Sequence, residues 1–215
     1  METTTVMRFS YIGQACEELL ARGFVDDAVM LALEQVGHGA RVDRVYIFER
    51  VDGARGGHKL CSQRYEWSAD RVTPQIDNPE LQNVDMDEIA PTWVAAFARD
   101  EHVAGLVQTM PEPTREVLVA QQIQSICVCP IIVGRDWWGF VGFDDCHGDR
   151  VWPDDEVRAL RRLSVALAAS LRRAQTHASL DAARRQLQAL ANDNPSGAPR
   201  PVSASRGAPS RRSSR

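Results

Sequence analysis

Two apolar runs joined by a short turn set the framework of this sequence. Residues 125–133 read SICVCPIIV, residues 134–136 read GRD, and residues 137–146 read WWGFVGFDDC. β-Branched and aromatic side chains dominate both runs, a composition typical of strands buried within a sheet. We therefore predict a hairpin over residues 125–146 and a fold organised around it.

A second hairpin is predicted nearer the N-terminus. In residues 41–53, RVDRVYIFERVDG, the side chains of Val45 and Ile47 alternate with those of Tyr46 and Phe48, as in a strand. A Gly-rich loop then leads to residues 58–67, HKLCSQRYEW. We expect this return strand to place three alternate side chains on one face: Cys61, Gln63 and Tyr65.

Helices are expected on both sides of the hairpins. Residues 14–37 carry apolar side chains at helical spacing, with Gly23 as a break and with Gly37 and Gly39 as the stop. Further along the chain, shorter helices are predicted in residues 86–101 and 112–123. An edge strand is predicted between them, in residues 102–110.

The longest predicted helix begins near Pro153, because proline suits the first turn and three acidic residues beside it complement the helix dipole. Leucines at 160, 163, 167 and 171 form its apolar stripe. A second stripe follows out of phase with the first, and consists of Leu180, Ala183, Leu187 and Leu190.

The order of these elements predicts the α+β class, with a central antiparallel sheet and helices packed on it. Residues 68–84 have no periodicity, and such long loops are often functional. The tail is rich in Pro, Ser, Gly and Arg, which predicts disorder. We expect four parts: a helical segment 1–23, a main domain 24–172, a helical extension 173–191 and the tail 192–215.

Charge and cysteine content narrow the classes of function. Residues 191–215 hold five of the 25 basic residues and one of the 29 acidic ones, so the main body is acidic and nucleic-acid binding is not expected. The sequence contains neither a signal peptide nor an apolar run long enough to span a membrane. Five cysteines without disulfide spacing predict reduced thiols and a cytoplasmic protein.

The sequence resembles a GAF domain, a small-ligand sensing module found in bacterial multidomain sensor proteins. The resemblance rests on VDRVYIFE at 42–49, SQRYEW at 62–67, IDNPELQN at 76–83, and the hairpin 125–146. Arg150 and Trp152, followed by an acidic helix start, also fit. The resemblance implies a sheet covered on one face by the terminal helices, with loops and middle helices enclosing a pocket on the other. It also implies a parallel homodimer through those terminal helices.

The candidate pocket follows from strand alternation and from this resemblance. Asp144 shares a strand face with Phe140 and Gly142, and it matches a position that contacts chromophore in bilin-binding relatives, where histidine is usual. Glycine inside a strand often marks the close approach of a ligand or a helix. Filled core and polar strand end remain the alternatives for these residues. The candidate ligand-binding set is Tyr46, Phe48, Tyr65, Trp67, Trp93, Cys127, Cys129, Trp138, Phe140, Gly142 and Asp144.

Several cofactors are not expected. Bilin-binding relatives attach chromophore through a Cys-His pair on the helix before the penultimate strand, and residues 112–123 contain neither residue. The motif of the cyclic-nucleotide phosphodiesterase members is also missing. Cys127 and Cys129 lack the spacing of a zinc site, and Asp144 and Asp145 point to opposite faces, so we expect neither a metal nor a catalytic dyad.

The resulting hypothesis is a small-molecule sensor or signal transducer that is not an enzyme and acts without an attached output domain. A histidine kinase or another output protein would then be its partner in trans. Two alternatives remain open. One is a dimerisation or protein-interaction module without a ligand. The other, a remote one, is a thiol-dependent reductase of free methionine sulfoxide.

Overall fold

The computed structural model describes residues 9–51 and 58–193, with side chains described as far as residue 190. The predicted Gly-rich loop and nearly all of the predicted tail lie outside these residues. The chain divides after Thr176 into two compact units, which are described separately.

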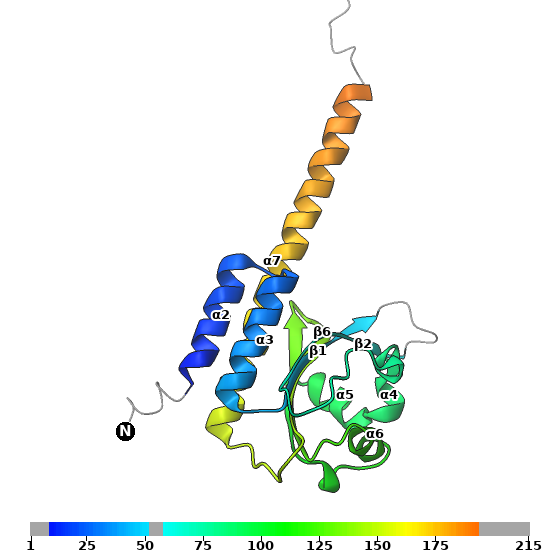
Figure 1. Cartoon of the computed structure of the whole chain (residues 1–215). Helices are drawn as coiled ribbons and strands as arrows, with labels where there is room; N and C mark the ends of the chain where they lie inside the picture. Colours follow the sequence, from blue (N-terminus) through cyan, green and yellow to red (C-terminus); the bar gives the residue numbers. More distant parts are fainter. Residues whose placement is uncertain (1–8, 52–57, 194–215) are drawn as a thin grey trace, which may run out of the picture. The chain divides into compact units, whose positions relative to one another are not determined.

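The centre of the first unit is an antiparallel sheet with strand order β3-β2-β1-β6-β5-β4. Three of these strands, β1, β2 and β6, are labelled in Figure 1. The two predicted hairpins, β1 with β2 and β5 with β6, form the middle of this sheet. They are joined because β6 also pairs with β1. The predicted edge strand is β4, which lies at one end of that order. The strands comprise β1 (Arg44–Val51), β2 (Leu60–Ser68), β3 (Val84–Asp85), β4 (Val103–Leu106), β5 (Ser125–Val133) and β6 (Asp136–Asp145). The α+β prediction is confirmed.

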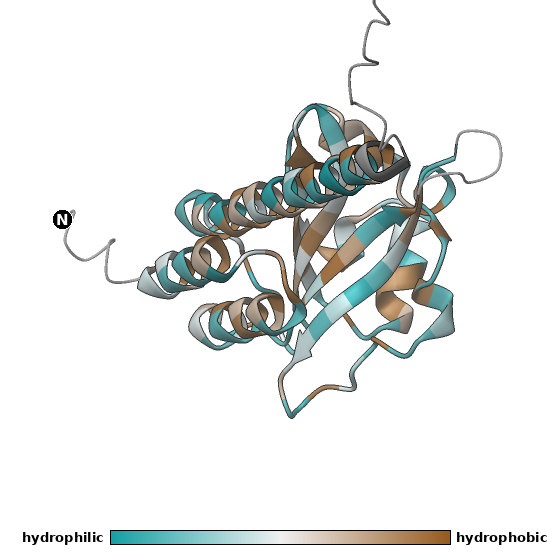
Figure 2. Ribbon diagram, turned by 90° about the horizontal axis from the view of Figure 1, so that it is seen from above, coloured by the Kyte–Doolittle hydropathy of each residue, from teal (hydrophilic) through white to brown (hydrophobic). Residues whose placement is uncertain are grey.

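One face of the sheet, here called the helix face, packs against α2 (Ser10–Arg22), α3 (Asp26–Ala40) and the start of α7 (Asp154–Asp193). Figures 1 and 2 show these three helices together on one side of the sheet. The core between them is mainly apolar, and the stripe predicted for the last helix lies in it: Leu160, Leu163, Leu167 and Leu171. Two serines of α7, Ser164 and Ser170, are also buried there, and the Ser170 hydroxyl donates to the carbonyl of Leu19.

The predicted stop of the first helical region is wrong in detail. Helix α3 runs through Gly37 and Gly39 and ends at Ala40. Both glycines are required by packing, because a Cβ on Gly37 would lie 2.1 Å from the Trp67 ring and one on Gly39 would lie 2.2 Å from the Tyr11 ring. They allow an aromatic ring to approach the helix backbone rather than ending the helix.

The opposite face of the sheet, here called the cavity face, is covered by short helices and loops. Three α-helices and two 3₁₀ helices form this cover, and a second apolar core lies beneath them. They are η2 (Pro79–Leu81), α4 (Met86–Ile89), α5 (Pro91–Phe97), η3 (Val107–Thr109) and α6 (Thr114–Ala120). The predicted loop 68–84 therefore contributes η2 to this layer and the first residue of β3 to the sheet.

Two β-bulges reverse the alternation of side chains within their strands. In β2 the register passes from Gln63 to Tyr65, and this leaves Arg64 without a partner across the ladder. In β6 it passes from Trp137 to Gly139, and this leaves Trp138 as the extra residue. Side chains on either side of a bulge no longer follow one simple period of two. Positions predicted by plain alternation therefore change face at these two points.

The connection between β6 and α7 is held by polar contacts to neighbouring elements. Ser125 Oγ donates to the carbonyl of Arg150 at 2.7 Å and accepts from Trp152 Nε1 at 2.7 Å. Arg150 Nη2 donates to the carbonyl of Ala40 at 2.9 Å and to Glu156 Oε1 at 2.5 Å. The end of the central strand and the start of α7 are thus tied to β5 and to α3.

The second unit contains the continuation of α7 from His177. Its predicted stripe is exposed on this unit, with Leu180, Leu187 and Leu190 at 53%, 68% and 61% exposure. Across the described residues, the helices lack the combination of length and hydropathy that a membrane span needs.

Candidate ligand-binding cavity

A small cavity lies between the cavity face of the sheet and the short helices. It offers about 50 Å³ in which the centre of a water molecule can lie. Its walls are mostly apolar, since strand residues Phe48 and Phe140 face Trp93 on α5 and Leu118 on α6. One end of the cavity is polar, where Arg44, Gln63 and Asp144 line it.

The aromatic wall is fixed by strand register. Phe48 and Phe140 are directly paired across β1 and β6, and their rings stack with centroids 4.9 Å apart and planes 5° apart. Trp93 meets the Phe140 ring edge-on, with centroids 6.1 Å apart. Such offset and edge-to-face contacts hold flat rings in defined positions, so this wall is preformed.

The polar end is also a product of register, because Arg44 pairs with Asp144 across β1 and β6. Arg44 Nη1 lies 3.6 Å from Asp144 Oδ2, and Arg44 Nε lies 3.9 Å from Glu66 Oε1. All three side chains are at most 3% exposed. Arg44 Nη2 donates to the carbonyl of Gln121 at 3.1 Å, which ties the guanidinium to the end of α6.

The two carboxylates around Arg44 differ sharply in their hydrogen bonding. Glu66 accepts from Gln63 Nε2 at 2.7 Å, from the Ser68 hydroxyl, and from the backbone N–H of Gln75 at 2.9 Å. Among the described residues, the Asp144 carboxylate accepts a single hydrogen bond, from the Tyr46 hydroxyl at 2.9 Å. Burial raises the pKa of Asp144 to about 7, against the opposing effects of Arg44 and Tyr46.

Four buried polar atoms at this end have no hydrogen-bond partner in the described part of the chain. They are Arg44 Nε, Arg44 Nη1, Gln63 Oε1 and Asp144 Oδ2. A buried polar atom without a partner costs about 1–3 kcal/mol, so such atoms are rare and call for a partner such as water, an ion or a ligand. Their residues all line the cavity, which makes it the best-supported candidate binding site in the described structure.

A surface groove of about 380 Å³ lies beside the cavity, between η2 and α6. The cavity and the groove share five lining residues: Leu81, Val84, Ile89, Val117 and Gln121. The cavity and the groove are therefore adjacent, separated by side chains that line both.

The structure brings together five of the predicted site residues around the cavity: Tyr46, Phe48, Trp93, Phe140 and Asp144. Gly142 is close to them but is covered, since a Cβ there would lie 2.3 Å from the Tyr46 ring. The missing side chain of Gly142 thus makes room for Tyr46, whose hydroxyl then reaches Asp144.

The other five predicted residues lie on the helix face, so their placement in the pocket was wrong. Tyr65, Trp67 and Trp138 follow or form the two bulges, which turn them towards the helices. Tyr65 donates to Asp26 Oδ1 at 2.7 Å, and Trp138 contacts the Phe24 ring edge-on. The remaining two belong to the helix-face core because β5 alternates in phase with Val141 and Phe143; they are Cys127 and Cys129.

Sequence reasoning missed most of the polar end of the cavity. Arg44 shares the strand face of Tyr46 and Phe48, so plain alternation could have found it. Glu66 reaches the same region only because of the bulge at Arg64, which no sequence signal marked. Gln121 contributes a backbone carbonyl, and side-chain patterns say nothing about that group.

A third buried carboxylate joins the loop after β2 to the end of β6. Asp43 accepts from the backbone N–H of Cys146 at 2.7 Å, from His147 Nδ1 at 2.9 Å and from Arg71 Nε at 2.5 Å. Burial acts to raise the pKa of Asp43, but these hydrogen bonds outweigh it and the pKa is lowered. Because its oxygens are occupied by protein donors, we read Asp43 as a structural tie.

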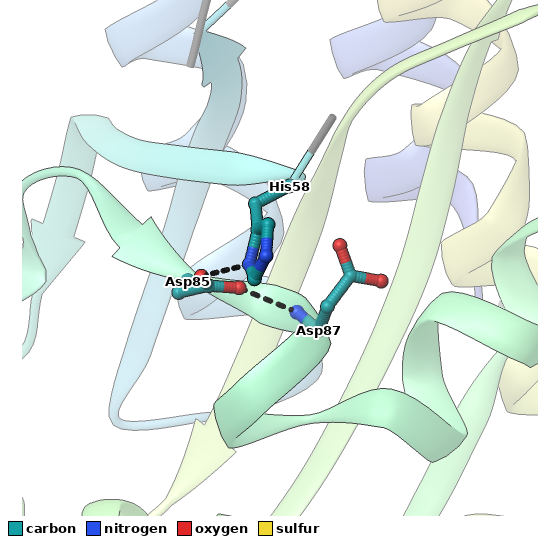
Figure 3. A group of neighbouring side chains, drawn as sticks. All are labelled: His58, Asp85 and Asp87. Atoms are coloured by element: carbon teal, nitrogen blue, oxygen red, sulfur yellow. Dashed lines mark hydrogen bonds and ion pairs between the residues drawn. The ribbon is translucent and has the colours of Figure 1, made fainter. Parts of the chain in front are cut away.

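A cluster of His58, Asp85 and Asp87 has a composition that could suit a metal ion (Figure 3). Its groups already have protein partners. Asp85 contacts His58 Nδ1 at 2.5 Å and caps α4 by accepting from the backbone N–H of Asp87 at 3.0 Å. Asp87 pairs with Lys59 at 3.1 Å. Capping and ion pairing account for the cluster, which the sequence did not reveal.

Comparison with known proteins agrees with this architecture. Residues 25–171 match the GAF domain family. The chain is also 38% identical over 176 residues to the methanogenesis regulatory histidine kinase FilI of Methanothrix harundinacea (strain 6Ac). That match covers 81% of this chain but only 19% of the kinase, so the chain spans less than a fifth of this relative's length.

Solved structures share the fold at low sequence identity. The far-red-absorbing dark state of JSC1_58120g3 with bound biliverdin IXα has a TM-score of 0.65 at 12% identity, over 77% of this chain and 99% of that one. The PixJ GAF domain of Thermosynechococcus elongatus has a TM-score of 0.62 at 13% identity, over 82% and 96%. GAF3 from Slr1393 of Synechocystis sp. PCC6803 has a TM-score of 0.58 at 21% identity, over 69% and 93%.

These likenesses concern the fold, whereas the family match extends over most of the residues that build the sheet and both of its covering layers. The chain belongs to the GAF domain family.

Proposed function

We propose that this GAF sensory domain binds a small molecule non-covalently in the cavity described above. The observation that carries the proposal is the set of unpartnered buried polar atoms on Arg44, Gln63 and Asp144, placed at one end of an apolar, aromatic-walled cavity. Ligand sites typically combine apolar walls, which supply affinity, with a few polar groups, which fix orientation.

A covalent bilin is not part of this proposal, although the far-red-absorbing neighbour holds biliverdin IXα. The Cys-His pair of this chain, Cys146 and His147, follows β6 and does not line the cavity, and His147 contacts Asp43. The cavity is also far below the roughly 300–1,000 Å³ of sites for drug-sized molecules. A small ligand is therefore the better match.

We further propose that the domain has no catalytic activity of its own. Thiol chemistry requires an accessible thiolate. Cys61, Cys127 and Cys129 are fully buried, and burial raises the pKa of Cys61 to about 12. These properties do not favour the sulfoxide reductase alternative. The five free cysteines suit a reducing compartment such as the cytoplasm.

The output of the sensor is proposed to be a histidine kinase or another signalling protein. Support comes from the relative in Methanothrix harundinacea, which is described as a histidine kinase and to which this chain is 38% identical. Within this chain, β6 carries Asp144 at the cavity and leads through the tied connection at Arg150 into α7. Ligand binding could shift the population of arrangements at this junction, within the limit of its differential affinity.

Thermal unfolding in the presence of a chemically diverse library of small molecules tests the proposal. A true ligand should raise the unfolding temperature progressively with its concentration, stabilising the fold by about 2.7 kcal/mol at a hundredfold excess over Kd. Val117→Trp should abolish this gain, because Val117 lines both the cavity and the groove.

The matched control is Val119→Trp on the same helix, since Val119 is exposed and lines neither space. It should retain the full stabilisation by any compound that stabilises the wild type. Compounds that stabilise the Val117→Trp variant equally well would place binding elsewhere. A library without any stabilising compound would contradict the proposed function.

A further inference from the structure

We propose that the polar end of the cavity selects a neutral amide-type group, one that presents a hydrogen-bond acceptor and a donor side by side, over carboxylates and over cations. The inference rests on the proposed function and names the ligand class of the same site. It is argued from the unpartnered atoms, from the charges that surround them and from the space available.

The unpartnered atoms include both donors and acceptors. Arg44 Nε and Nη1 can only donate, whereas Gln63 Oε1 and the ionised form of Asp144 Oδ2 can only accept. A carboxylate offers acceptors alone and an ammonium or amidinium offers donors alone. An amide offers a carbonyl to Arg44 and an N–H to Asp144, so it serves both kinds of atom at once.

The charges at this end disfavour a charged ligand group, and an anion most of all. One guanidinium, Arg44, faces two carboxylates, Glu66 and Asp144, and all three are buried. An anion would place a third negative charge beside Asp144. A cation would be attracted by the two carboxylates, but it would lie against the Arg44 guanidinium and leave the unpartnered Arg44 donors without an acceptor. Buried like charges repel strongly because little water screens them. A neutral dipolar group adds no charge to the cluster.

The geometry suits a group with two polar atoms close together. Arg44 Nη1 and Asp144 Oδ2 are 3.6 Å apart, too far for a hydrogen bond between them but close enough for one ligand group to reach both. The oxygen and nitrogen of a primary amide are about 2.2 Å apart. Each can therefore lie at hydrogen-bonding distance from its own partner.

The size of the cavity limits the head group to a few atoms. A single water molecule needs roughly 10–15 Å³ of space in which its centre can lie. The 50 Å³ of the cavity, measured in the same way, therefore accommodates about four heavy atoms. Acetamide has that size. Acetate and acetamidinium have nearly the same planar shape and differ from it mainly in charge, which makes the three molecules a matched set.

The experiment titrates acetamide, acetate and acetamidinium separately into the isotopically labelled full-length protein at pH 8.5. Nuclear magnetic resonance signals from the Trp93 indole and the Phe140 amide report on the cavity. Acetamide should bind on the order of tenfold more tightly than either charged probe, because the charged probes leave buried groups unpaired. Equal or tighter binding of acetate or acetamidinium would overturn the inference.

Asp144→Asn provides an independent check because it replaces the acceptor oxygen by a donor and removes one negative charge. In this variant acetate should become the preferred probe, since it would then meet donors from both Arg44 and the new amide. Asp136→Asn, at an exposed position at the start of β6, should keep the wild-type order. An unchanged order in Asp144→Asn would contradict the assignment.

Failure of this inference is distinguishable from failure of the proposed function. If a library compound stabilises the wild type but not Val117→Trp, the cavity binds a ligand whatever the three probes do. Absence of binding by all three probes, or a preference for a charged one, would then refute the amide class alone.

Discussion

Asp144 and Glu66 show how two carboxylates beside the same guanidinium acquire different properties. Glu66 is held by donors from Gln63, Ser68 and Gln75, whereas the Asp144 carboxylate has one hydrogen-bond donor in the described part of the chain, the Tyr46 hydroxyl. Burial without enough donors favours the protonated form of a carboxyl group. At the scale of single residues, the cavity therefore contains one group that titrates near neutral pH.

This titration predicts a pH-dependent stability. The pKa of Asp144 is raised in the folded state, so its protonated form favours folding below the ordinary aspartate pKa. That contribution should be lost as the pH rises from about 4 through about 7, by up to about 4 kcal/mol. The charged or titratable groups that influence it are Arg44, Tyr46, Glu66 and Asp43.

Urea unfolding of the wild type and of Asp144→Asn across this pH range measures the effect. The difference between the two unfolding free energies should move in favour of the variant as the pH increases, because the variant has no group to ionise there. Asp136→Asn should follow the wild-type curve. A constant difference between wild type and Asp144→Asn would refute the raised pKa.

At the scale of elements, most of the helices and strands could be predicted, because each rests on local periodicity. The faces of β2 and β6 could not be predicted in full. Arg64 and Trp138 are bulge residues, and bulges depend on pairing with strands distant in sequence. Tyr65 and Trp138 were therefore assigned to the cavity although they pack against the helices.

The packing of α3 on β2 predicts opposite effects for two glycine substitutions. Gly37→Ala should destabilise the fold by about 1–3 kcal/mol, because the new Cβ would meet the Trp67 ring at 2.1 Å. Gly13→Ala on α2 should instead stabilise the fold by about 0.5–1 kcal/mol. Nothing lies within 4 Å of the place where the new Cβ would be, and alanine favours the helix more than glycine does. Chemical denaturation measures both, and a stable Gly37→Ala variant would contradict this packing.

At the scale of the whole molecule, the antiparallel sheet and its helix layer were predicted from the order of the elements, and both are confirmed. The pocket residues Phe48, Phe140 and Asp144 could be assigned because plain alternation holds for them: Phe48 lies on β1, which has no extra residue, and the other two lie on the same side of Trp138. The small size of the cavity could not be predicted. It depends on how α5 and α6 settle on the sheet, and a single sequence does not specify that distance.

Formation of a homodimer through α7 remains a proposal. The exposed apolar stripe on the part of α7 that belongs to the second unit makes this proposal testable. Leu180, Leu187 and Leu190 are exposed and, with Ala183, follow the alternating spacing of three and four that coiled coils use. Analytical ultracentrifugation should find a dimer for the wild type. The double substitution Leu180→Glu and Leu187→Glu should produce monomers, because it places charges in the seam.

Gln188→Glu changes a residue outside that stripe on the same helix, so it should leave the dimer intact. A wild-type protein that remains monomeric at micromolar to millimolar concentrations would refute the dimer. Dimers that survive the double substitution would place the interface on another surface.

The extra residue in β6 has a consequence for how relatives of this protein could diverge. Loss of the codon for Trp138 would restore an unbroken ladder and leave Trp137 opposite Ile132 on the cavity face, because the bulge has absorbed the extra residue. An insertion or deletion of one residue that no bulge absorbs would instead exchange the side chains that face the cavity for those that face the helices. Lineages could change their ligand preference by this route with few point substitutions.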